Sequence, residues 1–164
     1  MAKNKKPTKK YKPRARFVNP LGYVIENISP VAKHDSYLLD LKIKNSQAMA
    51  SLLRGAAVKD DIDKLVSMSN IVEALCAIGF GKDYAAHAVD GREAVLRIVY
   101  RAVEIHRFVP TGPEINALNM MMELHDAQMD VITLGDMDRA LTYATNKIRN
   151  KGATKLPRLT LTGA

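Results

Sequence analysis

A chain of 164 residues is long enough for one domain with its own core and too short for two domains of ordinary size. The composition is 47% hydrophobic but only 5% aromatic, with eight methionines and no tryptophan, which favours an aliphatic core of helices packed on helices. The first sixteen residues carry eight Lys or Arg and no acid, which equals the net charge of +8, so the rest of the chain is neutral and a uniformly basic globule is excluded.

Those sixteen residues predict a disordered basic arm, because a dense run of like charge with two prolines and no apolar periodicity cannot bury enough surface to offset ordering entropy. Lys and Arg set among prolines, with one tyrosine free to stack on an unpaired base, are typical of an arm that follows a phosphate backbone. A solubility tail or a localisation signal is the alternative. The predicted nucleic-acid-binding residues of the arm are Lys3, Lys5, Lys6, Lys9, Lys10, Tyr11, Lys12, Arg14 and Arg16.

The basic start does not predict export. The segment after it contains Asn19, Pro20, Gly22 and Glu26, which interrupt any apolar stretch of the kind a signal peptide needs. No window approaches the roughly 18 consecutive apolar residues of a membrane span. We therefore expect a cytoplasmic protein with no membrane partner.

The first elements of the domain follow from local signals. The Pro-Gly turn at 19–22 predicts a small hairpin or an extended strap over 17–28. Ser29 and Pro30 fit an N-cap and a first helical position, which predicts a helix that ends before Gly55. A second helix is expected from Asp60 to Ile78.

Three more helical regions are expected after the second. The third covers 83–108, divided into two pieces at Gly91, and its almost continuously apolar second half predicts the central core helix. The fourth opens at Pro113 and reaches Ile132, with four methionines on its apolar side. Cys76, the only cysteine, is expected to be a small buried hydrophobe on the second helix.

The fifth helix begins at a capping box, Thr133 to Asp136, and runs to Lys151. Residues 140–164 hold five basic residues and no acid, so this region predicts a second phosphate contact through Lys147, Arg149 and Lys151. A helix-turn-helix is disfavoured, because Asp130 and Asp136 fall where that motif needs apolar residues. The fold class is therefore a compact all-α bundle of about five helices, with an arm at 1–16, a bundle domain at 17–152 and a short basic C-terminal tail at 153–164.

No set of residues predicts catalysis, a cofactor or a metal. His125 and Asp126 form the dipeptide of helical metal phosphohydrolases, but they lie within a periodic helix, where Asp126 belongs to an exposed polar stripe and His125 borders it. The glycine pair at Gly79 and Gly81 lacks the length and the preceding strand of a phosphate-binding loop. We expect a protein that is not an enzyme.

Three short motifs resemble a group of uncharacterised small helical proteins of proteobacterial phages, prophages and plasmids. They are the Lys-Lys-Tyr-Lys-Pro run at 9–13, Thr-Gly-Pro-Glu at 111–114 and Leu-His-Asp-Ala-Gln at 124–128. The resemblance implies a mobile-element origin and a host cytoplasm, with no assigned activity.

The expected function is that of a non-enzymatic nucleic-acid-associated accessory protein of a mobile element, which binds DNA or RNA through its arm. The alternative is a protein-binding adaptor or inhibitor of a host complex, such as defence or transcription machinery, acting through an exposed part of the Met-rich fourth helix. A helical metal hydrolase is a distant third. The sequence does not indicate an oligomeric state.

Overall fold

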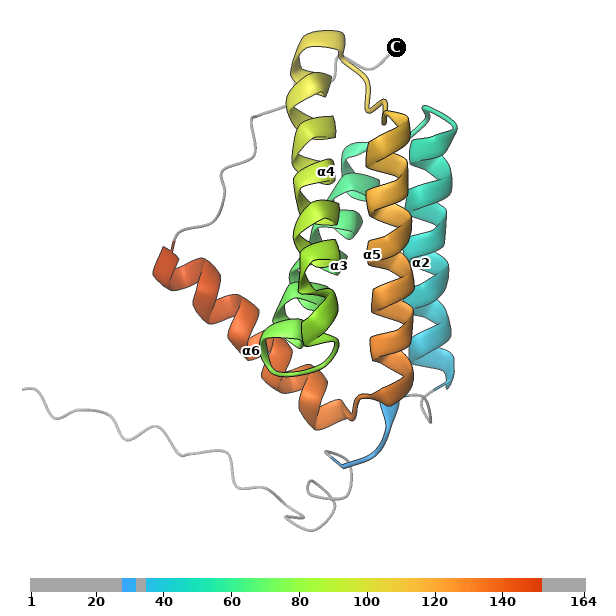
Figure 1. Ribbon diagram of the computed structural model, residues 1–164. Helices are drawn as coiled ribbons and strands as arrows, with labels where there is room; N and C mark the ends of the chain where they lie inside the picture. Colours follow the sequence, from blue (N-terminus) through green and yellow to red (C-terminus); the bar gives the residue numbers. More distant parts are fainter. Residues whose placement is uncertain (1–27, 32–34, 152–164) are drawn as a thin grey trace, which may run out of the picture.

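The computed structural model describes residues 28–31 and 35–151, and within them the chain forms five α-helices and no strand longer than a single bridge. Figure 1 shows α2 to α5 lying side by side as an upright bundle, which α6 crosses obliquely. The predicted all-α bundle is confirmed, whereas the arm, all but the last residue of the strap, and the tail lie outside the described residues. The elements are α2 Asp35–Leu53, α3 Lys59–Ala77, a 3-10 turn Lys82–Tyr84, α4 Ala85–Ile105, α5 Gly112–Val131 and α6 Leu134–Lys151.

The predicted helix start at Ser29 and Pro30 is wrong. Pro30 instead forms an antiparallel bridge with Thr133, and the amide of Leu134 donates to the Ser29 carbonyl at 3.0 Å. The amide of Val31 donates to the carbonyl of Ile132 at 2.9 Å, and the Val31 side chain is fully buried. These backbone groups find their partners at the corner between α5 and α6, so the helix begins later, at Asp35.

The central helix is α3, not the second half of α4 as predicted. Helix α3 contacts α2, α4, α5 and α6, whereas α4 packs on α3 and α5 and leaves Val103 and Ile105 exposed. A helix surrounded on several sides must bury residues around most of its circumference. Its buried residues are Asp61, Ile62, Leu65, Met68, Ser69, Val72, Ala74, Leu75 and Cys76.

The predicted break at Gly91 is also wrong, because α4 is continuous through that residue. Gly91 is buried, and a Cβ atom added there would lie 2.5 Å from Sδ and 2.6 Å from Cβ of Met121 on α5. Real Cβ atoms do not approach other atoms so closely. The glycine is therefore needed for the close approach of α4 to α5, and it does not form a turn.

We expect Gly91→Ala to lower the free energy of unfolding by roughly 1–3 kcal/mol, because overpacking against Met121 exceeds the gain of about 1 kcal/mol in helix propensity. Gly112→Ala is the matched control: it lies at the start of α5 with nothing within 4 Å of its added Cβ, and it should leave stability unchanged or raise it. Urea denaturation followed by circular dichroism measures both. A Gly91→Ala protein as stable as the parent would contradict the packing argument.

The starts of α5 and α6 are fixed by reciprocal side-chain caps. At α6 the amide of Thr133 donates to Oδ2 of Asp136 at 3.0 Å, and the amide of Asp136 donates to Oγ1 of Thr133 at 3.2 Å. This confirms the predicted capping box. Thr111 and Glu114 form the equivalent box at α5.

Candidate functional site

His125 does not border the exposed stripe as predicted; it is buried, with 1% of its surface exposed. Its Nδ1 lies 3.3 Å from Oδ1 of Asp126, which remains partly exposed. Burial lowers the pKa of the imidazole, against the raising effect of the Asp126 carboxylate. Across residues 28–31 and 35–151, no three His, Cys, Asp or Glu side chains gather as metal ligands would.

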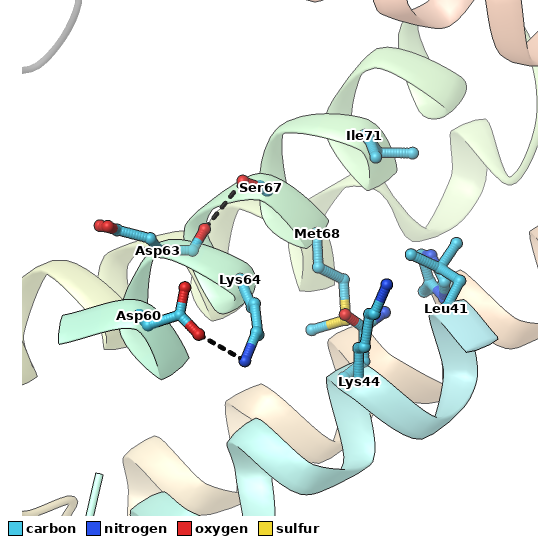
Figure 2. Close-up of a pocket in the computed structure, with 10 residues that line it drawn as sticks. Leu41, Lys44, Asp60, Asp63, Lys64, Ser67, Met68 and Ile71 are labelled. Atoms are coloured by element: carbon cyan, nitrogen blue, oxygen red, sulfur yellow. Dashed lines mark hydrogen bonds and ion pairs between the residues drawn. The ribbon is translucent and has the colours of Figure 1, made fainter. Parts of the chain in front are cut away.

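A pocket of about 260 Å³ opens between α2 and α3 and is also lined by His125 of α5. Figure 2 shows Lys44 on the α2 side facing Lys64 and Asp60 on the α3 side, with Met68 between the two helices. Nothing in the sequence indicates that these three helices meet at one cavity. The lining residues are Leu41, Lys44, Asn45, Asp60, Asp63, Lys64, Ser67, Met68, Ile71 and His125.

Helix α6 has two faces of different character. Met137 and Ala140 are buried against the bundle, and this inward side packs on α3. The outward side carries the polar and basic residues that suit contact with phosphates and base edges. These residues recur at spacings of three and four and are all exposed: Arg139, Thr142, Asn146, Arg149 and Asn150.

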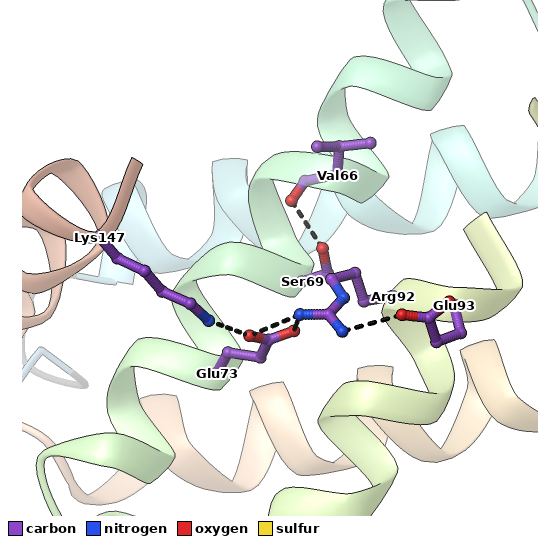
Figure 3. A network of polar contacts seen from close by, with 6 residues as sticks. All are labelled: Val66, Ser69, Glu73, Arg92, Glu93 and Lys147. Atoms are coloured by element: carbon purple, nitrogen blue, oxygen red, sulfur yellow. Dashed lines mark hydrogen bonds and ion pairs between the residues drawn. The ribbon is translucent and has the colours of Figure 1, made fainter. Parts of the chain in front are cut away.

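Lys147 differs from its predicted partners because it lies between these faces and is held by an ion pair. Its Nζ lies 2.6 Å from Oε2 of Glu73 on α3. Glu73 also forms an ion pair with Arg92 of α4, whose Nη1 lies 2.8 Å from Oε1 of Glu73. Arg92 in turn pairs with Glu93 (Figure 3). A phosphate that engaged Lys147 would have to compete with Glu73.

The other predicted contacts divide between described and undescribed parts of the chain. Arg149 is exposed near the end of α6, and Lys151 is its last residue, with a side chain outside the described part. All nine arm residues from Lys3 to Arg16 lie outside the described residues. The 18 residues of α6 give it a length of about 27 Å, which separates its basic end from its first two turns, where Asp136 and Asp138 lie.

The Met-rich helix offers a smaller apolar surface than the adaptor alternative expects. Met121 and Met129 are fully buried in the core, Met122 is half-buried, and Met120 is 41% exposed. Two exposed aliphatic residues lie instead two turns apart on α6, Leu141 and Ile148, each 45% exposed.

The expectation for Cys76 is confirmed. The side chain is buried, and its thiol donates to the Gly81 carbonyl with a sulfur-to-oxygen distance of 3.4 Å. Burial raises the thiol pKa, so the reactive thiolate is disfavoured.

Comparisons with known proteins identify no family for the chain: no family model matches it, and no curated protein or solved structure shows significant similarity. Among the helices of residues 35–151, none combines the length and the apolar character that crossing a bilayer requires. Function is therefore inferred from the residues of the chain itself.

Proposed function

We propose that the protein is a non-enzymatic, nucleic-acid-associated accessory protein that binds the phosphate backbone of DNA or RNA through residues 1–16. The basic end of α6, with Lys147, Arg149 and Lys151, supplies a second contact. The association with a mobile element rests on the short phage and plasmid motifs. The observation that carries the proposal is the separation of charge: eight basic residues without an acid precede a body of zero net charge.

The ion pairs of the body support this assignment of binding to the ends of the chain. On α2 and α3 several lysines lie beside an acid one turn away, as in Lys44 with Asp40 and Lys64 with Asp60. Such pairs at spacing four are helix-surface contacts that compensate local charge. Phosphates are therefore drawn to the unbalanced ends and not to the α2–α3 surface.

The position at which the chain enters the fold supports the pairing of the arm with α6. The backbone bonds of Ser29 and Val31 fix residues 29–31, which are separated from the arm by residues 17–28, beside Ile132 and Leu134 at the start of α6. The second basic segment begins at the other end of the same helix. Because the twelve residues 17–28 can span at most roughly 40 Å, a nucleic-acid strand lying along α6 would be within reach of both basic segments.

The test is titration of the full chain with labelled single-stranded and duplex oligonucleotides at 50 and 200 mM salt. If six to ten phosphates are engaged, affinity should fall roughly 10³-fold or more between these concentrations and depend little on sequence. Absence of binding at the lower salt concentration would overturn the proposal.

The α6 contact is tested by Arg149→Gln in the same titrations. We expect a modest, sequence-independent loss of affinity and a decrease of about one in the salt slope, because one phosphate contact is removed. Lys59→Gln is the matched control, since Lys59 is an exposed cation at the start of α3 that pairs with Asp63. An equal effect of the two substitutions would remove α6 from the interface.

A protein-binding adaptor remains the second candidate function, and the exposed pair Leu141 and Ile148 favours it. Its partner would stay bound to the protein after nuclease treatment and after loss of the arm charges. Co-purification of the full chain from its native cell, with and without nuclease, distinguishes the two functions.

A further inference from the structure

Helix α4 carries a line of apolar side chains on the side away from its buried residues. The helix packs on α3 and α5, and Figure 1 shows it at the edge of the bundle. Val89, Leu96 and Val103 recur every seven residues, and Tyr100 follows Leu96 by four, so all four share one helix face. Leu96 is half-buried, and the other three are between 41% and 53% exposed.

These four residues, the α4 seam, form a continuous apolar surface. Single exposed aliphatic residues are common, whereas a line of them on one helix is typical of an interaction site. From Val89 to Val103 the seam extends over about 21 Å, at 1.5 Å for each helical residue. That length fits a partner which presents another helix.

Charges of opposite sign flank the seam on the side nearer α5. Glu93 and Arg97 are four residues apart, so they are neighbours on the helix surface. Glu93 pairs with Arg92, and Nε of Arg97 lies 3.6 Å from Oε1 of Glu114, yet the two side chains remain 44% and 54% exposed. Both can therefore also meet charges of a partner.

The order of these charges is complementary to itself. A twofold axis perpendicular to α4, level with residue 95, places Glu93 of one copy opposite Arg97 of the other, and the reverse. Like charges then stay four residues, about 6 Å, apart along the helix. In the same antiparallel arrangement Val89 lies between the levels of Tyr100 and Val103 of the other copy, and the two Leu96 side chains meet near the axis.

We propose that the α4 seam binds a second copy of this chain, in a twofold antiparallel dimer with reciprocal Glu93–Arg97 ion pairs. Residues 17–164 carry no net charge, so two bodies do not repel each other at long range. One helix pair is a small interface, so the dimer is reversible and dissociates in the micromolar range. No seam residue belongs to residues 1–16 or to α6, so failure of this proposal leaves the nucleic-acid interface untouched.

Sedimentation velocity of the nuclease-treated full chain tests the dimer without nucleic acid. Between about 1 and 200 µM the average mass should rise from that of one chain to that of two. A chain that stays monomeric over this range overturns the proposal and leaves the seam to a different protein. Growth beyond two chains also overturns it, because a twofold contact closes on itself.

Charge exchange tests the antiparallel pairing. Glu93→Arg and Arg97→Glu each place like charges opposite one another, so each should weaken the dimer at least tenfold. An equimolar mixture of the two variants should dimerise again, because every basic position of one chain then faces an acidic position of the other. A merely structural effect of the substitutions would not be rescued by mixing. Folded variants whose mixture stays monomeric overturn the pairing.

A matched pair of apolar substitutions locates the surface. Val103→Gln should weaken the dimer at least tenfold, because the twofold axis repeats the loss on both copies. Ile43→Gln on α2 is the control, since Ile43 and Val103 are 44% and 43% exposed, and it should leave the dimer unchanged. Circular dichroism checks that both variants keep their helices. Equal dimerisation of the two variants overturns the assignment to α4.

Discussion

Replacing the eight Lys and Arg of residues 1–16 by Gln is expected to remove most of the affinity for DNA and RNA while leaving the helical content unchanged. Each cation that engages a phosphate releases condensed counterions, so affinity falls with salt at a slope of about −0.9 per phosphate for duplex and −0.7 for single strands. Eight engaged cations would give a duplex slope near −7, on the order of 10³–10⁵ in affinity between 50 and 200 mM salt. The substituted chain carries no net charge, and its affinity should fall with salt at a slope no steeper than about −2.

Gel-shift titrations at the two salt concentrations measure this effect, with far-ultraviolet circular dichroism as the check on helix content. Tyr11→Ala separates stacking from charge: it should weaken binding to single strands, where one stacked base contributes roughly 1–3 kcal/mol, and leave duplex binding unchanged. Equal binding by the parent and the Gln-substituted chain would contradict the proposed role of the arm. Retention of a protein partner by that chain would then favour the adaptor.

The helix boundaries that the sequence predicts best are those set by neighbouring residues. The start of α6 was predictable because Thr133 and Asp136 are three residues apart and cap each other. The bounds of α3 and α5 lie within two residues of the prediction, because apolar periodicity and glycine or proline at the ends are local signals.

The errors have a common physical origin in partners that are distant in the sequence. From its neighbours alone, Pro30 is a plausible first helical residue. It is not helical because it forms a bridge with Thr133, about a hundred positions later in the chain. Gly91 looks like a helix break from its neighbours alone, but it lies inside a continuous helix and leaves room for the Met121 side chain of α5. Neither partner is indicated by the residues that surround the affected position.

The pocket was predictable only in part. Asn45 falls in the apolar spacing with Leu41, Met49 and Leu52, and a polar residue in such a stripe is a signal of a buried polar atom. The sequence does not show that His125 of another helix lines the same cavity. The arm, in contrast, is a charge pattern that can be read directly, and it remains a prediction until binding is measured.

Glu114→Gln is expected to lower the free energy of unfolding at pH 7 by about 3 kcal/mol. The Glu114 side chain is 3% exposed and accepts from Arg101 through both oxygens, at 2.6 and 2.9 Å, and from the Thr111 amide at 2.8 Å. Burial alone would raise the pKa of this carboxyl, but these hydrogen bonds outweigh it and lower the pKa to about 2 from 4.5. The neutral amide retains the shape but loses the charge that faces Arg101.

The same shift fixes the pH dependence of the Glu114 contribution. The unfolded chain binds a proton at this carboxyl near pH 4.5 and the folded chain only near pH 2, so acid favours unfolding between these values. The contribution is complete above pH 4.5 and is lost as the pH falls toward 2. The difference between parent and Glu114→Gln in urea denaturation should therefore be largest at pH 7 and shrink at pH 3. Glu123→Gln, at an exposed position of the same helix, should cost less than 0.5 kcal/mol, as surface substitutions usually do. A Glu114→Gln difference that stays constant between pH 7 and pH 3 would mean that its cost comes from packing and not from the ion pair with Arg101.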